Sequence, residues 1–81
     1  AAMTTAERMH VGRVKESGCA SCGSPGAVEA HEIEQGQWFT SVGLCPDCHR
    51  GTNGLHGTKA YMRIRKQTEL SLLNETLRRL M

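Results

Sequence analysis

Residues 44–57 read LCPDCHRGTNGLHG and hold two cysteines, two histidines and three glycines. The pair Cys45-x-x-Cys48 has a counterpart upstream, Cys19-x-x-Cys22, and 22 residues separate the two pairs. Each CxxC knuckle places two sulfurs on adjacent corners of a tetrahedron, so that two knuckles together complete a four-cysteine zinc site. The spacing therefore predicts a structural zinc ion held by all four cysteines.

The size of the chain makes such a site plausible on energetic grounds. It has 81 residues, of which 38% are hydrophobic, and its three aromatic residues are Trp38, Phe39 and Tyr61. A hydrophobic core of this size gives only marginal stability unless a disulfide or a metal ion adds to it. Zinc ligation would supply the missing folding free energy. We therefore expect a single zinc domain over residues 1–81.

The cysteines and the N-terminal residues also indicate in which cellular compartment the protein is expected. No apolar run is long enough to span a membrane, and the first ten residues, AAMTTAERMH, lack the basic-then-apolar pattern of a signal peptide. Four cysteines in an intracellular chain are typical of metal binding rather than of disulfides. We therefore expect a cytoplasmic protein without a membrane partner.

The motif CPDCH at residues 45–49 is also the attachment motif of c-type haem. A haem at this position would leave Cys19 and Cys22 without a role. It would also need more apolar and aromatic surface than this chain provides. Haem is therefore not expected.

Local patterns predict the order of the secondary-structure elements. Thr4 and Glu7 form a capping box for a helix over residues 4–16. Residues 27–44 predict two short strands joined by a turn at EQGQ (residues 34–37). The residues expected on the second strand are Trp38, Thr40 and Val42.

Two helices are predicted after the second knuckle. Thr58 is a candidate N-cap for a helix that ends near Lys66, and Thr68 is a candidate N-cap for a helix that runs to the end. Four leucines recur in the last helix at helical spacing and are interpreted as core residues: Leu70, Leu73, Leu77 and Leu80. The pattern as a whole predicts a small α+β zinc domain.

Three histidines near the knuckles remain if sulfur alone binds the zinc. His31 lies on the first predicted strand, His49 directly follows the last zinc cysteine, and His56 follows the glycine-rich gap. Three imidazoles brought together would form a second metal site with open positions, as in a catalytic centre. Any one of them alone is more simply a surface or hydrogen-bonding residue, and this is the interpretation for His10.

Basic residues are concentrated in the last part of the chain. Residues 58–81 carry six lysines and arginines against two glutamates, although the net charge of the whole chain is only +2. Such a segment suits a polyanion such as nucleic acid, and equally a solvated helix face.

Together, the segments CASCG, EAHEIEQGQWFTSVGLCPDCHRG and GLHG resemble phage HNH endonucleases, in particular the recombination-enhancement nucleases, whose cleavage is tied to RecA-coated DNA. The resemblance covers about residues 17–81. It implies a ββα-metal core with a treble-clef-like zinc, flanked by helices, in a protein encoded by a phage or prophage and active in the bacterial host cell. It also implies hydrolysis of DNA phosphodiester bonds at a single divalent metal ion.

The resemblance further implies roles for individual residues. His31, His49 and His56 match the ligands of the catalytic metal, which could be zinc, magnesium or manganese, and Asn53 is an alternative ligand to His56. Glu32 falls at the position of the general base, where the family has histidine. Four cations would hold DNA phosphates: Arg50, Lys59, Arg63 and Lys66.

The glutamate at the base position determines the expected rate. Glutamate carboxylates ordinarily titrate near ~4.3, and a nearby dication favours the charged form further, so that such a group is a weak base at neutral pH. We therefore expect a slow or inactive nuclease. The alternative is a non-catalytic zinc module that binds DNA or protein, derived from a degenerate HNH domain.

Overall fold

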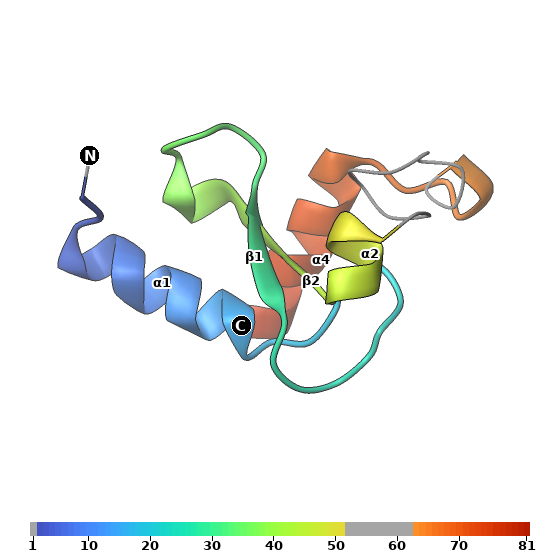
Figure 1. The fold of residues 1–81 in the computed structure, drawn as a ribbon, viewed down its shortest axis with the longest axis horizontal. Coiled ribbons are helices and arrows are strands. Elements are labelled where there is room, and N and C mark those ends of the chain that lie inside the picture. Colours follow the sequence, from blue (N-terminus) through green and yellow to red (C-terminus); the bar gives the residue numbers. More distant parts are fainter. Residues whose placement is uncertain (1, 52–62) are drawn as a thin grey trace.

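A two-stranded antiparallel hairpin lies at the centre of the fold (Figure 1). The computed structural model describes residues 2–51 and 63–81. Strand β1 (Glu29–Glu32) pairs with strand β2 (Ser41–Leu44). Helix α1 precedes the hairpin, the short helix α2 follows β2 directly, and helix α4 ends the chain. The structure is therefore a small α+β domain.

The register of the hairpin decides which side chains share a face. His31 lies opposite Val42, and Glu29 lies opposite Leu44. Directly opposed residues point to the same side of an antiparallel pair, whereas successive residues of one strand point to opposite sides. Glu29 and His31 therefore share the face of Val42 and Leu44, and Glu32 lies on the other face.

Helix α1 (Thr5–Lys15) begins as the sequence predicts. The Glu7 amide donates to Thr4 Oγ1 over 3.1 Å, and the Thr4 amide donates to Glu7 Oε1 over 2.7 Å, which completes the capping box. The helix buries Val11 and Val14. The predicted N-terminal helix and its cap are confirmed.

The end of α1 approaches the backbone of β2 closely at Gly43. A Cβ atom at this position would lie 3.1 Å from each of three atoms: Gly18 O, Ser17 Oγ and Val14 O. Two of these are backbone atoms, which cannot move away as a flexible side chain can. A side chain here would push these neighbours away by a few tenths of an ångström, and the small size of glycine allows α1 to cover this face of β2 closely.

Helix α4 (Glu69–Leu80) covers the other face of β2, and its cap also follows the prediction. The Ser71 amide donates to Thr68 Oγ1 over 3.0 Å, and the Thr68 amide donates to Ser71 Oγ over 2.8 Å. Leu72 and Leu73 pack with Val42 and Leu44 in one apolar cluster. Because both of its faces are covered, every residue of β2 is buried.

The prediction that four leucines of the last helix are core residues is wrong for two of them. Leu70 is 74% exposed and Leu77 is 37% exposed, whereas Leu72 and Thr76 are buried. Thr76 is accommodated because its hydroxyl accepts from the Gly43 amide over 3.2 Å and donates to the Leu72 carbonyl over 2.9 Å. The buried arc of the helix therefore includes a polar residue, which a search for apolar spacing does not select.

The predicted second strand begins too early, because Trp38 and Thr40 belong to a short 3-10 helix, η1 (Trp38–Thr40). Gly36 has a φ of +87°, and the Thr40 amide donates to the Gln37 carbonyl over 3.3 Å. The Thr40 hydroxyl donates to the same carbonyl over 3.0 Å, and the Ser41 hydroxyl donates to the Trp38 carbonyl over 2.6 Å. These local hydrogen bonds pair the polar groups of the turn with one another, and pairing with β1 therefore starts only at Ser41.

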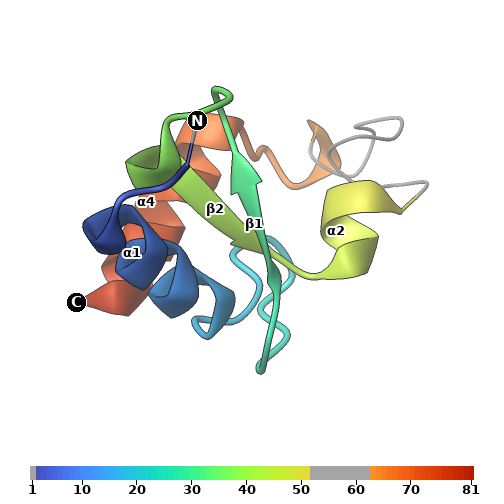
Figure 2. The same ribbon diagram turned by 60° about the vertical axis from the view of Figure 1, so that its left-hand side comes forward.

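In the view of Figure 2, α1 and α4 are seen to the left of the hairpin and α2 (Pro46–Arg50) to its right. Within the described parts of the chain, no helix is long and apolar enough to cross a membrane. Thr58, the predicted cap of a further helix, lies outside the described residues. The predicted end of that helix agrees with the left-handed conformation of Lys66, whose φ is +56°.

The burial pattern of α4 predicts different effects for two neighbouring leucines. We expect Leu72→Ala to lower the free energy of unfolding by about 2–5 kcal/mol, because it leaves a cavity in the core. Leu70→Ala, the matched control, removes an exposed side chain and is expected to change it by less than about 0.5 kcal/mol. Urea unfolding of the zinc-loaded variants measures both. Equal losses would show that the assignment of the buried face is wrong.

Candidate metal centre

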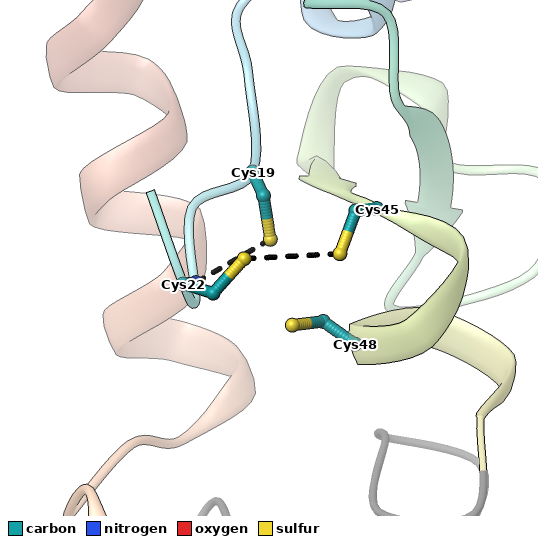
Figure 3. Close-up of side chains that lie close together, drawn as sticks. All are labelled: Cys19, Cys22, Cys45 and Cys48. Atoms are coloured by element: carbon teal, nitrogen blue, oxygen red, sulfur yellow. Dashed lines mark hydrogen bonds between the residues drawn. The ribbon is translucent and has the colours of Figure 1, made fainter. Parts of the chain in front are cut away.

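Four cysteine side chains converge at one end of the hairpin (Figure 3). Cys19 and Cys22 come from the loop between α1 and β1, and Cys45 and Cys48 come from the start of α2. Their sulfur atoms all lie within 4.8 Å of one another. Within residues 2–51 and 63–81, this is the one group of three or more potential ligands with such geometry. The predicted clustering of the four cysteines is confirmed.

The first knuckle is a tight turn closed by backbone hydrogen bonds. The Cys19 amide donates to the Ser24 carbonyl over 2.8 Å, and the Gly23 amide donates to the Cys19 carbonyl over 2.9 Å. The Cys22 amide donates to Cys19 Sγ over 3.4 Å. Gly23 adopts a φ of +81°, a conformation that L side chains rarely adopt. The backbone thus directs both sulfurs to the same point.

The second knuckle is formed where the strand changes into a helix. Cys45 is the N-cap of α2, Pro46 occupies the first turn, and the His49 amide donates to the Cys45 carbonyl over 2.9 Å. Cys48 therefore lies one helical turn after Cys45, and the two sulfurs point to the same side. The helix ends at Arg50, and Gly51 is its C-cap.

The cysteine cluster is continuous with the apolar core. Cys19 is fully buried and packs with Val28, Leu44 and Leu72, while Cys45 and Cys48 are partly buried against the same cluster. A metal ion at this position would therefore join both knuckles to the core. Four thiolates in a tetrahedron are the ligand set of structural zinc sites, and the residues present fit that ion.

The pKa values of the thiols indicate what a bound dication would change. Burial, together with hydrogen bonds to Cys45 and Cys19, raises the pKa of Cys48 to about 12, and burial also raises the pKa of Cys45. At Cys22, burial acts in the same direction, but hydrogen bonds with Ser24 outweigh it and lower the pKa to about 6. The four sulfurs do not all ionise without a positive charge among them, so that metal binding displaces protons.

Two of the three predicted catalytic histidines lie together beside this cluster. The ring centroids of His31 and His49 are 5.1 Å apart, with the rings edge to face. Both side chains are largely shielded from solvent, with 9% and 14% of their surfaces exposed. His56, Asn53 and Lys59 lie outside the described residues.

Each of these histidines is bound to a carboxylate. His31 Nε2 lies 3.0 Å from Glu69 Oε2, and His49 Nδ1 lies 2.8 Å from Glu29 Oε1. Glu29 could have been found in the sequence, since it lies two residues before His31 and thus on the same strand face. Glu69 could not, because the chain brings it from a different element.

Arg50, a predicted phosphate contact, binds the same glutamate. Its Nε donates to Glu29 Oε1 over 3.0 Å and its Nη2 donates to Glu29 Oε2 over 2.5 Å. The hydrogen bond from His49 and the adjacent Arg50 guanidinium outweigh the effect of burial and lower the pKa of Glu29. A DNA phosphate would have to compete with this carboxylate for Arg50. Arg63 and Lys66, in contrast, are exposed.

Glu32, the predicted general base, points away from the histidine pair. It follows His31 on an extended strand and therefore lies on the opposite face. Its Oε2 accepts a hydrogen bond from the Gly36 amide over 2.6 Å. The same carboxylate borders a hollow that Glu7 and Trp38 also line. The structure thus brings His31 and His49 together but does not bring Glu32 to them.

Removal of one sulfur ligand tests the cysteine site. Cys48→Ser is expected to abolish tight zinc binding and cooperative folding, because the metal provides stability that the small core lacks. Metal analysis and circular dichroism measure the two effects. Ser24→Ala is the matched control: it removes a hydroxyl 3.0 Å from Cys22 Sγ but no ligand, and should keep one zinc ion. A Cys48→Ser protein that retains its zinc would contradict the assignment.

The affinity for zinc should also depend on pH. The raised pKa values of Cys45 and Cys48 mean that these thiols hold protons near neutral pH when no metal is bound. Zinc must displace both protons, so that its affinity rises with pH, by about a hundredfold per pH unit for two protons. Chelator competition between about pH 6 and about pH 8 measures this slope. An affinity independent of pH would mean that the thiols are already ionised.

No family model, curated protein or solved structure matches this chain. The assignment of the site therefore rests on the convergence of its own cysteines, histidines and glutamates.

Proposed function

We propose that this protein is a metal-dependent endonuclease of the HNH type that hydrolyses DNA phosphodiester bonds, with a four-cysteine zinc as its scaffold. The observation that carries the proposal is the pair His31 and His49, whose rings lie 5.1 Å apart beside the cysteine cluster. Two shielded imidazoles beside a structural metal site are the start of a second, open metal site.

The order of the elements supports an HNH core of the treble-clef kind. A cysteine knuckle comes first, a hairpin follows, and the remaining two cysteines lie at the start of a helix. In this order β1 contributes His31, and α2 contributes His49 directly after Cys48. One scaffold would thus hold both metal sites.

The chemistry of the donors suits a divalent transition metal. Histidines that bind a metal through one ring nitrogen usually donate the other to a carboxylate or carbonyl oxygen, and both histidines here have a carboxylate at one nitrogen. Imidazole ligands favour zinc over magnesium, which prefers oxygen ligands. His56, or Asn53 in its place, is the proposed third ligand and lies outside the described residues.

In the proposed reaction, His31 and His49 would hold a divalent ion next to the scissile phosphate. A divalent ion, when bound, supplies Lewis-acid stabilisation of the charge that develops on the phosphate. Arg63 and Lys66 are exposed and would hold flanking phosphates without reading the bases, and Lys59 is proposed for the same role. The proposed partner is DNA, including DNA coated with RecA.

One observation favours a second candidate function, a non-catalytic zinc module that binds DNA or protein. Glu32 stands at the position of the family's base, but its carboxylate accepts a hydrogen bond from Gly36 on the face opposite the histidines. A protein that kept both metal sites and lacked a base would bind DNA without cleaving it efficiently. This geometry also agrees with the expectation of slow cleavage.

A plasmid-nicking assay with zinc, manganese or magnesium tests the proposal. We expect slow nicking by the parent and a loss of about 100-fold or more in His31→Ala and in His49→Ala, because a metal ion contributes several kcal/mol to the transition state. The structural zinc should remain in both variants. His10→Ala is the matched control, since His10 lies on α1 against Phe39, away from the pair.

The possible outcomes separate the two functions. Nicking that survives in both histidine variants would contradict the proposed site. A parent that binds DNA but never nicks it with any of the three metals would favour the non-catalytic module.

A further inference from the structure

The four sulfurs of the cysteine cluster differ in their exposure to solvent. Cys22 is exposed, whereas Cys19 is fully buried in the apolar core, and Cys45 and Cys48 are partly buried. The oxidation of a cysteine depends on its exposure and on its thiolate character, and cysteines bind zinc as thiolates. A small oxidant in solution would therefore reach the sulfur of Cys22 first.

Cys22 also faces a sulfur of the other knuckle. Figure 3 shows Cys22 and Cys45 opposite each other, and their sulfur atoms lie 3.8 Å apart. A disulfide has an S–S bond of about 2.05 Å, so that these two atoms would need to approach each other by less than about 2 Å. Residues 22–27 are all exposed, and Cys22 can therefore make this movement without a change in the core.

We propose that the cysteine cluster is a reversible redox switch, in which a peroxide links Cys22 to Cys45 by a disulfide and thereby releases the zinc ion. This inference goes beyond the proposed nuclease activity, because it depends on the cysteine cluster alone. Cys19 is excluded as the partner of Cys22, because its sulfur is fully buried and packs in the core.

The proposed oxidation has two steps. In the first step, the Cys22 thiolate attacks one oxygen of hydrogen peroxide, an S–O bond forms, the O–O bond breaks and hydroxide leaves, so that the sulfur is oxidised to a sulfenic acid. In the second step, the Cys45 thiolate attacks this sulfur, the S–S bond forms, the S–O bond breaks and a second hydroxide leaves. Two thiolates and one peroxide thus give one disulfide and two hydroxide ions.

The disulfide would leave Cys19 and Cys48 as the remaining ligands of the cluster. A structural zinc site is formed by four ligands, so that the ion would be lost. Cys22 belongs to the loop after α1 and Cys45 to the start of α2, and the disulfide therefore joins the same two elements that zinc would join. Reduction by a dithiol would then restore all four ligands with both knuckles still close together. A disulfide within one knuckle would not connect these elements.

Disulfide mapping of the zinc-loaded parent after treatment with hydrogen peroxide tests the choice of cysteines. Cleavage after the glutamates of β1 separates the two knuckles, cleavage before Asp47 separates Cys45 from Cys48, and fragment spectra distinguish Cys19 from Cys22. We expect a link between Cys22 and Cys45, with about one zinc ion released per disulfide. Dithiothreitol followed by zinc should restore the zinc-loaded protein.

Two histidine substitutions provide a matched pair of variants. Three cysteines and one histidine also form structural zinc sites, so that Cys45→His and Cys48→His should each keep one zinc ion. Cys45→His removes the proposed partner of Cys22, and we expect its disulfide yield to fall about 10-fold or more, with the sulfenic acid of Cys22 trapped by dimedone. Cys48→His should form the same disulfide as the parent.

A second control concerns methionine, which peroxide also oxidises. Met9 is 67% exposed, and Met9→Leu should release zinc at the rate of the parent. Loss of zinc release in this variant would overturn the proposal, because oxidation of a methionine would then be the cause of the release.

The other outcomes are equally distinct. A disulfide that joins Cys19 to Cys22 or Cys45 to Cys48, or zinc release with all four thiols unmodified, would overturn the proposed pair. A parent that binds no zinc would overturn the cysteine metal centre itself, and the redox switch with it. Where a histidine variant does not load zinc, the disulfide map of the parent decides.

Discussion

The convergence of four cysteine sulfurs within 4.8 Å is the constraint on which the other features of this domain depend. It joins the loop after α1 to the start of α2, and Cys19 extends the cluster into the apolar core. The raised pKa of Cys48, about 12, means that the cluster needs a dication before all its thiols ionise. Binding of a dication by the four cysteines would therefore couple folding to metal loading.

The position of the histidine pair follows from the same constraint. His49 is placed by Cys48, its neighbour in the chain, and His31 is placed by the pairing of β1 with β2, which runs directly into Cys45. A change in strand register by one residue would turn His31 to the opposite face. The knuckles and the strand register together thus determine whether the two imidazole rings lie close to each other. The proposed nuclease activity depends on this proximity.

Local signals in the sequence predicted the parts of the fold that depend on neighbouring residues. The capping residues Thr4 and Thr68 and both cysteine knuckles lie where the spacing placed them. The predictions failed at positions whose burial or partners depend on residues far away in the sequence. Leu70 is exposed, whereas Thr76 lies on the buried arc of the helix, where its hydroxyl finds two hydrogen-bond partners. Glu69 reaches His31 across 38 positions of sequence, a contact that no local spacing can reveal.

The proposed metal ligand and the predicted general base lie on opposite faces of β1. Glu29 and His31 lie on one face and contact α2 and α4, whereas Glu32 lies on the other face and binds the Gly36 amide. An extended strand cannot direct successive side chains to the same point. While this strand remains extended through both residues, the Glu32 carboxylate faces away from His31 and stays bound to the Gly36 amide. It follows that the proposed metal site can form whether or not the chain cleaves DNA, and that fast cleavage would require a base from the face of the histidines.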